Sequence, residues 1–215
     1  MTMEATTRIF AIRHGETAWN RDTRIQGQLD IGLNERGRAQ AEAVAEALRG
    51  EPLAAVYSSD LSRARETAQA IANATGAPLH LDSALRERAF GHFQGKTWAE
   101  IAEHWPEDSL RWRQRDLDFA PGGGESLPVL YERCIGAVLR IAAAHPGEAI
   151  AIVAHGGVMD CLYRAGTRQS LQAARAWQLG NATINRLLYT GEGLVVTGWN
   201  DDSHLTHLAL DEQST

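Results

Sequence analysis

The sequence holds little cysteine: only Cys134 and Cys161 occur in 215 residues, and they do not form a C-x-x-C pair. That count excludes the disulfide framework on which small secreted domains depend. A chain of this length can bury a substantial core without such staples. The expected location is therefore a reducing compartment, the cytoplasm.

Excess positive charge is also missing, since the formal net charge is -6 and the pI is about 5.7. Proteins that grip nucleic acid broadly do so with dense lysine and arginine surfaces. No nucleic-acid partner is expected. Any anionic ligand must be held by a local cluster of cations.

No segment reaches the roughly 20 apolar residues that a membrane helix needs, and residues 1–10 lack the pattern of a secretory signal. We therefore expect no membrane partner. Apolar residues make up 44% and charged residues 22% of the chain, a globular composition. The prediction is a single domain over residues 1–215.

Apolar runs and helical stripes alternate along the chain, which predicts an α/β fold with a mostly parallel central sheet and helices on both of its faces. A loop-rich segment at about 90–125 interrupts the alternation and is predicted to form a lid. The expected strands are 9–12, 53–59, 78–85, 148–155, 183–190 and 193–199, and the expected helices are 34–50, 58–76, 97–105, 126–145 and 170–179.

Two of the apolar runs end in a histidine followed by glycine, at His14 and His155. In open α/β sheets, ligands bind beyond the carboxyl ends of the strands, so both histidines are expected at one site. Arg13 precedes the first histidine. Arg63 and Glu87 follow the second and third predicted strands, which brings them to the same edge.

These residue types suit phosphoryl chemistry. Two guanidinium groups bind phosphate oxygens, a neutral imidazole can attack phosphorus, and a carboxylic acid can protonate the leaving oxygen. Each residue also has a common structural role. Arg63 can pair with Glu66 or Glu42 on the protein surface, and Glu87 can pair with a neighbouring arginine.

Five ordered motifs, "RHGETAWN", "SSDLSRARETA", "LRERAFGHFQG", "GGESL" and "AHGG", resemble the histidine phosphatase superfamily, in the branch that contains cofactor-dependent phosphoglycerate mutases and broad phosphatases. The resemblance implies a three-layer α/β/α fold and a phosphohistidine on His14. It further implies that Glu87 acts as acid and then as base. The implied phosphate pocket contains Arg13, Arg63 and His155, with Asn20, Gln26, Gly27 and Gly156 beside it.

The family includes phosphatases and mutases, and this chain departs from the mutase pattern. Trp98 stands where related mutases carry a lysine, and Phe90 replaces a tyrosine. Arg113 is followed by Gln114 in place of a second arginine. Lys96 and Arg115 are the cations left to take the vacated roles.

The resulting prediction is a phosphatase for small phosphate monoesters that needs no metal and no cofactor, with Phe90, Trp98 and Arg113 touching the substrate. One alternative is a phosphoglycerate mutase, which would need 2,3-bisphosphoglycerate as a primer. The second alternative is a non-catalytic regulatory module that binds phosphate. A homodimer is left open.

Overall fold

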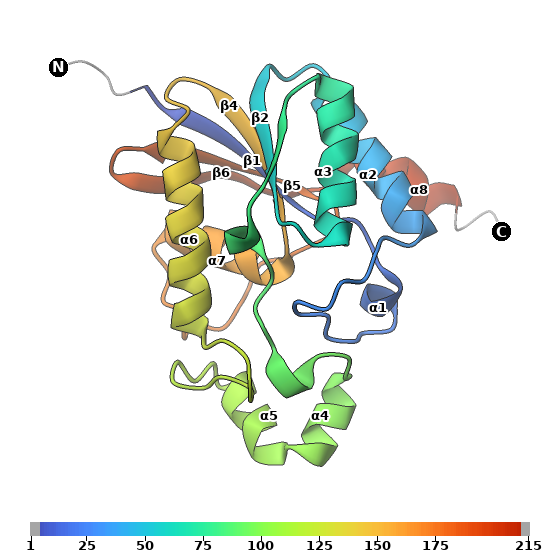
Figure 1. Cartoon of the computed structure of the whole chain (residues 1–215), viewed down its shortest axis with the longest axis vertical. Helices are drawn as coiled ribbons and strands as arrows, with labels where there is room; N and C mark the ends of the chain where they lie inside the picture. The colour runs from blue at the N-terminus through green and yellow to red at the C-terminus, as the bar shows by residue number, and fades with distance from the viewer. Residues whose placement is uncertain (1–4, 212–215) are drawn as a thin grey trace.

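The structure is a computed structural model and describes residues 5–211 (Figure 1). The strands are β1 (Thr7–Arg13), β2 (Leu53–Ser58), β3 (Leu79–Leu81), β4 (Ala149–Ala154), β5 (Ile184–Thr190) and β6 (Gly193–Asp201). The α-helices are α1 (Ala18–Arg21), α2 (Glu35–Leu48), α3 (Ser62–Thr75), α4 (Trp98–His104), α5 (Pro106–Arg113), α6 (Leu127–Ala143), α7 (Gly156–Thr167) and α8 (Thr206–Asp211). Short 3-10 turns, η1 (Ser83–Leu85), η2 (Gly91–Phe93) and η3 (Ser203–Leu205), complete the list.

The strands form one sheet in the order β3-β2-β4-β1-β5-β6. Strands β3, β2, β4 and β1 run parallel to one another, whereas β5 runs antiparallel to β1 and β6 antiparallel to β5. The two-residue link between β5 and β6 is too short for a parallel crossover, so these strands form a hairpin. The prediction of a mostly parallel sheet is confirmed.

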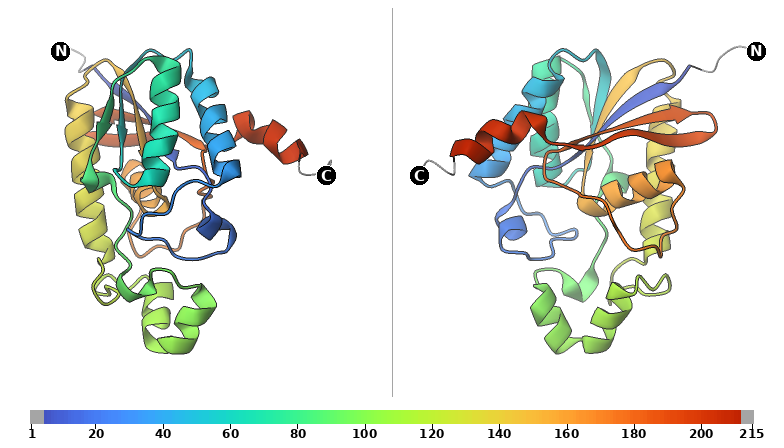
Figure 2. Two further views of the ribbon diagram at one scale, coloured as in Figure 1. Left: turned by 45° about the vertical axis from the view of Figure 1, so that its right-hand side comes forward. Right: turned by 180° about the vertical axis from the view of Figure 1, so that it is seen from behind.

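Helices cover both faces of the sheet, as the alternation of β1 requires. Ile9 and Ala11 pack in a core with α6 and α7, while Phe10 and Ile12 pack in a second core with α2 and α3. Figure 2 shows the two helical layers on opposite sides of the strands. The three-layer α/β/α fold is confirmed.

Local signals mark the helix ends as predicted. The Asn34 side chain accepts a hydrogen bond from Gly37 N at 2.7 Å and caps α2. Thr97 and Glu100 form a reciprocal capping box at the start of α4, and Gly76 ends α3 in a left-handed conformation. Each arrangement satisfies backbone groups that a helix end leaves without partners.

One predicted helix is wrong: residues 170–179 form turns and bends. Side chains outside this segment donate hydrogen bonds to its backbone carbonyls. Arg115 donates to the carbonyl of Leu171, Arg164 donates to that of Ala173, and the Trp199 indole donates to that of Gln178. These tertiary hydrogen bonds outweigh a weak helical propensity.

Four helices occur where no helix was predicted: the short α1 and α8, and also α5 and α7. Pro106 begins α5, because the first position of a helix needs no N–H. Helix α7 begins at Gly156 immediately after β4. Glycine pairs are poor helix formers, so the start of α7 has no propensity signal.

The segment 90–125 lies at the carboxyl end of the sheet, where α4 and α5 form a separate lobe (Figure 1). Its own small core contains Phe93, Ile101 and Phe119, and Ile25 from the loop after β1 joins them. This lobe is called the lid below. Within residues 5–211, no helix combines the length and the apolar character needed to cross a bilayer.

Candidate active site

Strand register brings the two histidines together. Arg13 is paired with Ala154 in the parallel ladder between β1 and β4, so His14 and His155 follow at equivalent positions. Their ring centroids lie 5.2 Å apart. Both side chains are buried.

Hydrogen bonding decides the tautomer of His14. Its Nδ1 lies 2.7 Å from the carbonyl oxygen of Gly15, and a carbonyl can only accept, so Nδ1 carries the proton. Nε2 keeps its lone pair. Burial, followed by the charges of Arg63 and Arg13, holds the pKa of His14 well below its usual value, so the ring is neutral at neutral pH.

Two guanidinium groups flank this ring, that of the buried Arg63 and that of the partly buried Arg13. Arg63, in the first turn of α3, donates to the carbonyls of Leu29 and Gly27 at 2.8 and 2.7 Å. Arg13 donates to the carbonyl of Leu179. Carbonyl partners position a guanidinium without neutralising its charge. Burial lowers the pKa of Arg63 to about 10, so this group remains cationic at neutral pH. Burial also lowers the pKa of Arg13, while the charge of Glu87 opposes that shift.

Several buried polar atoms at this point have no hydrogen-bond partner. They are Arg13 Nε, Arg63 Nε, Gln26 Oε1 and both ring nitrogens of His155. Buried groups of this kind are rare because leaving one unpaired costs about 1–3 kcal/mol. The two guanidinium N–H donors among them, Arg13 Nε and Arg63 Nε, indicate a site whose acceptors arrive with an anionic ligand.

A cavity of about 160 Å³ lies beside these groups and is called the inner cavity below. It is lined by Arg13, His14, Asn20, Arg24, Ile25, Gln26, Gly27, Arg63, Glu87 and Phe90. His155 is not among the lining residues and contacts the site through the His14 ring.

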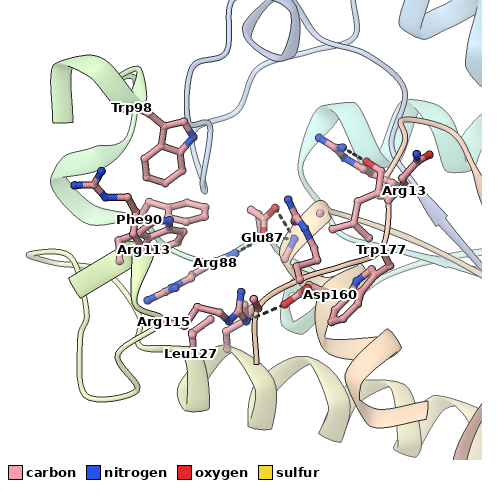
Figure 3. A pocket seen from close by; sticks show the side chains of 18 of the residues that line it. Arg13, Glu87, Arg88, Phe90, Trp98, Arg113, Arg115, Leu127, Asp160 and Trp177 are labelled. Carbon is pink, nitrogen blue, oxygen red and sulfur yellow. Dashed lines mark hydrogen bonds and ion pairs between the residues drawn. The ribbon is translucent and has the colours of Figure 1, made fainter. Parts of the chain in front are cut away.

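A second cavity of about 910 Å³, the outer cavity, adjoins the first and shares Arg13, Glu87 and Phe90 with it. Figure 3 shows Trp98, Phe90 and Arg113 of the lid on one side and Asp160 and Trp177 on the other. The small cavity has the size for a phosphoryl group, and the larger one can hold the rest of an ester.

Glu87 stands at the junction of the two cavities. Its carboxylate accepts from Gly157 N at 3.0 and 3.1 Å and from Arg88 N at 2.8 Å. Among residues 5–211, Glu87 forms no surface ion pair. The neighbouring Arg86 pairs instead with Asp60 at 2.6 Å.

The predicted substrate-binding residues divide between the cavities. Asn20, Gln26 and Gly27 line the inner cavity, Gly156, Trp98 and Arg113 line the outer cavity, and Phe90 lines both. Arg63 forms no ion pair with Glu66 or Glu42, since its guanidinium is held by backbone carbonyls. The structure therefore brings the predicted residues together, and their roles stay predictions.

A family model described as histidine phosphatase superfamily (branch 1) matches residues 9–202. The chain belongs to this superfamily. The phosphoglycerate mutase-like protein 4 of Arabidopsis thaliana is 44% identical over 92% of this histidine phosphatase and 86% of the relative. A metal-independent phosphoserine phosphatase from the same plant is 43% identical over 95% of this chain and 85% of its own.

Solved structures agree with the fold of this histidine phosphatase. YhfR from Bacillus stearothermophilus superposes with a TM-score of 0.87 at 32% identity, over 93% of this chain and 99% of its own. A mycobacterial glucosyl-3-phosphoglycerate phosphatase superposes with a TM-score of 0.81 at 34% identity, over 91% and 99% of the two chains.

Sequence reasoning missed part of the site of this histidine phosphatase. Arg88 is buried, its guanidinium lies 4.4 Å from the centre of the Trp112 ring, and burial lowers its pKa to about 10. In the sequence, the position of Arg88 next to Glu87 had indicated a surface ion pair. Asp160, Arg175 and Trp177 also line the outer cavity, and the wrong helix at 170–179 concealed the last two.

Among residues 5–211, no group of three or more His, Cys, Asp or Glu side chains is placed to hold a metal ion. His204, whose spacing from His207 is compatible with a metal pair, has its Nε2 2.9 Å from the carbonyl oxygen of Ala182. That contact gives His204 a structural role at the end of β6.

Proposed function

We propose that this histidine phosphatase hydrolyses small phosphate monoesters through a phosphohistidine on His14. One observation carries the proposal: the unprotonated Nε2 of His14 lies beside a phosphate-sized cavity surrounded by buried polar atoms without partners. A phosphoryl group in the inner cavity would supply acceptors to the unpaired Nε atoms of Arg13 and Arg63. It would also compensate the two guanidinium charges.

The reaction runs in two balanced steps. In the first, the lone pair of Nε2 attacks phosphorus, the bond between phosphorus and the ester oxygen breaks, and Glu87 gives its proton to the departing alkoxide. In the second, Glu87 takes a proton from water while the water oxygen attacks phosphorus. The bond to His14 then breaks, and inorganic phosphate leaves.

Charge on the transferring group is stabilised by the arginines throughout both steps. No metal or organic cofactor enters this scheme, which agrees with the name of the metal-independent phosphoserine phosphatase to which the chain is similar. The proposal includes a cytoplasmic location and a small-molecule substrate, with neither a nucleic-acid nor a membrane partner. It also takes residues 1–215 as one domain and leaves a homodimer open.

A phosphoglycerate mutase is the second candidate, and one feature of the outer cavity favours it. Arg88, Arg113, Arg115 and Arg175 all line that cavity, and arginines suit the carboxylate of a phosphoglycerate. A mutase must retain its bisphosphorylated intermediate, which requires such additional cations. Several relatives carry names of the mutase type.

Phosphorus NMR separates these two reactions. 3-Phosphoglycerate is incubated with the protein, with and without a trace of 2,3-bisphosphoglycerate, and 2-phosphoglycerate and free phosphate are followed together. We expect phosphate release from this or other monoesters without isomerisation. Fast formation of 2-phosphoglycerate that depends on the primer would instead make the protein a mutase.

The covalent step has its own test. Rapid acid-free quenching followed by mass spectrometry should find a phosphoryl adduct on His14 in the wild type and none in His14→Gln. His145→Gln is the matched control, because His145 is bonded to Tyr57 and Glu148 outside both cavities. Undiminished turnover in His14→Gln would reject the mechanism, and activity that requires added divalent metal after EDTA treatment would reject the metal-free pocket.

A further inference from the structure

The outer cavity has a wall that the proposed mechanism does not use. Asp160 of α7 and Trp177 of the segment 168–183 line it on the side opposite the lid (Figure 3). Both side chains contact Arg164. Its Nε lies 2.9 Å from Asp160 Oδ2, and its guanidinium lies 4.7 Å from the centre of the Trp177 ring.

Asp160 presents an acceptor without a partner. The residue is only 7% exposed. Its Oδ2 accepts from Arg115 Nη2 at 3.0 Å and from Arg164 Nε at 2.9 Å. Its Oδ1 is buried and has no hydrogen-bond partner within the described part of the chain, residues 5–211. A carboxylate oxygen accepts more than one hydrogen bond, so this half of the group is left unsatisfied.

Trp177 presents the complementary donor. Its indole Nε1 is also buried without a partner, although buried tryptophan N–H groups usually have one. The ring itself is firmly placed. It stacks on Tyr163 with centroids 4.1 Å apart and an interplanar angle of 21°, and Arg164 lies against it.

The unpaired acceptor and the unpaired donor on the same wall indicate which kind of ligand group would bind there. A hydroxyl group both donates and accepts, whereas an ammonium group only donates and a carboxylate only accepts. The opposite wall of the cavity carries the aromatic side chains Phe90, Trp98 and Trp112. The partly negative faces of such rings suit the C–H groups of a polyol.

The volume of the outer cavity also favours a polyol. Its volume of about 910 Å³ is near the upper end of the roughly 300–1,000 Å³ range of small-molecule sites. Two of its five arginines already donate hydrogen bonds to protein acceptors: Arg115 to Asp160 and to the carbonyl of Leu171, and Arg88 to the carbonyls of Glu125 and Phe119. A leaving group larger than serine or glycerate therefore fits this space.

We infer that Asp160 and Trp177 bind a hydroxyl group of the leaving group, so that the substrate is the phosphate monoester of a polyol or sugar. The inference rests on the proposed phosphatase function. Asp160 and Trp177 act as specificity residues: they hold the distant part of the ester, while His14 and Glu87 perform the chemistry.

The test compares two phosphates of the same chain length, sorbitol 6-phosphate and hexyl phosphate, with para-nitrophenyl phosphate as a reference without an aliphatic hydroxyl. In the wild type, kcat/KM should be at least about 10-fold higher for sorbitol 6-phosphate than for hexyl phosphate, because an analogue without the hydroxyl leaves both buried groups unpaired. A ratio of one or below would overturn the inference.

Trp177→Phe keeps an aromatic ring but removes the N–H together with the second ring of the indole, and Asp160→Asn replaces one carboxylate oxygen by an amide nitrogen. Each should cut the sorbitol-to-hexyl ratio to less than about 3-fold and change para-nitrophenyl phosphate turnover by less than about 3-fold. Trp105→Phe is the matched control. Trp105 packs on His92 and Phe93 in the core of the lid and lines neither cavity, so this variant should leave the ratio unchanged.

The outcomes distinguish the inference from the proposed function. Failure of the wild type to hydrolyse any of the three phosphates would reject the phosphatase itself. Hydrolysis of para-nitrophenyl phosphate together with a ratio that Trp177→Phe does not alter would reject only the hydroxyl site. A clear preference for phosphoserine or 3-phosphoglycerate over sorbitol 6-phosphate would assign the outer cavity to an anionic leaving group.

Discussion

At the scale of the residue, His14 shows how burial prepares a nucleophile. The carbonyl of Gly15 orients the ring, and the neighbouring guanidinium groups of Arg13 and Arg63 disfavour its protonation. The same charges that would bind a phosphoryl group thus also keep the attacking nitrogen unprotonated. His155 experiences the same environment, since burial followed by the Arg63 charge lowers its pKa well below the usual value.

A direct prediction concerns the titration of these two rings. In protein labelled at histidine Cε1 and kept in a buffer free of phosphate and sulfate, NMR should show the signals of His14 and His155 without a transition near pH 6.5. The histidines of the urea-unfolded chain should titrate at about 6.5. Transitions at that pH in the folded protein, assigned with His14→Gln and His155→Gln, would contradict the pocket electrostatics described here.

Glu87 leads to a prediction about leaving groups. Glu87→Gln keeps the shape of the side chain and removes the transferable proton. Turnover of alkyl phosphates should fall about 100-fold or more, the usual contribution of a general acid. Para-nitrophenyl phosphate, whose leaving group needs little protonation, should slow by less than about 10-fold. Equal losses on both substrates, measured by phosphate release, would remove Glu87 from the acid role.

At the scale of the element, the start of α7 positions the acid. Gly157 N donates to both carboxylate oxygens of Glu87. From the other side, Arg133 of α6 donates to the carbonyls of Ala84, Arg86 and Glu87, and Glu125 holds Arg133 at 2.8 Å. Two helices thus hold the loop that carries Glu87, which explains how a loop residue keeps a defined place.

A pair of glycine substitutions tests this arrangement. A Cβ at Gly157 would lie 2.2 Å from Glu87 Oε1, so Gly157→Ala must displace the carboxylate, and kcat for alkyl phosphates should fall at least about 10-fold. In Gly136→Ala on α6, the new Cβ meets nothing within 4 Å. This control should keep its activity and gain about 0.5–1 kcal/mol of stability. Normal kcat in Gly157→Ala would show that the contact does not position Glu87.

At the scale of the whole molecule, the two buried histidines of the site lower the stability of the fold at acidic pH. The lowered pKa values of His14 and His155 mean that the unfolded chain binds more protons below its own pKa of about 6.5. The contribution that the neutral, buried histidines make to the free energy of unfolding is therefore fully present above that pH. It is lost progressively as the pH falls from about 6.5 toward the folded-state pKa values.

Chemical denaturation at pH 7 and pH 5 measures this effect. The free energy of unfolding should fall in the wild type by up to about 2 kcal/mol for each histidine more than it falls in the double variant His14→Gln/His155→Gln. Buffers without phosphate or sulfate are needed, since a bound anion would stabilise the protonated rings. The same fall in both proteins would show that the histidines do not cause it.

Structural features that depend on contacts close in the sequence were predicted correctly, whereas features that depend on contacts with other parts of the chain were not. The caps at Asn34 and Thr97 depend on contacts three residues away, so they were predicted with their helices. At 170–179, the deciding contacts come from Arg115, Arg164 and Trp199, which are distant or follow later in the chain. Hydrogen bonds of that kind leave no periodic trace in the segment itself.

The sequence by itself determined where the chemistry is located. Apolar runs that end at His14 and His155, in strands expected to be parallel, place both rings at the carboxyl edge of one sheet. Only the tertiary structure decided how those groups are used. It assigned the proton of His14, tied Glu87 to Gly157 and left Asp160 and Trp177 with unpaired polar atoms. Strand positions follow from local periodicity, whereas each of these features depends on which distant backbone and side-chain groups meet once the chain has packed.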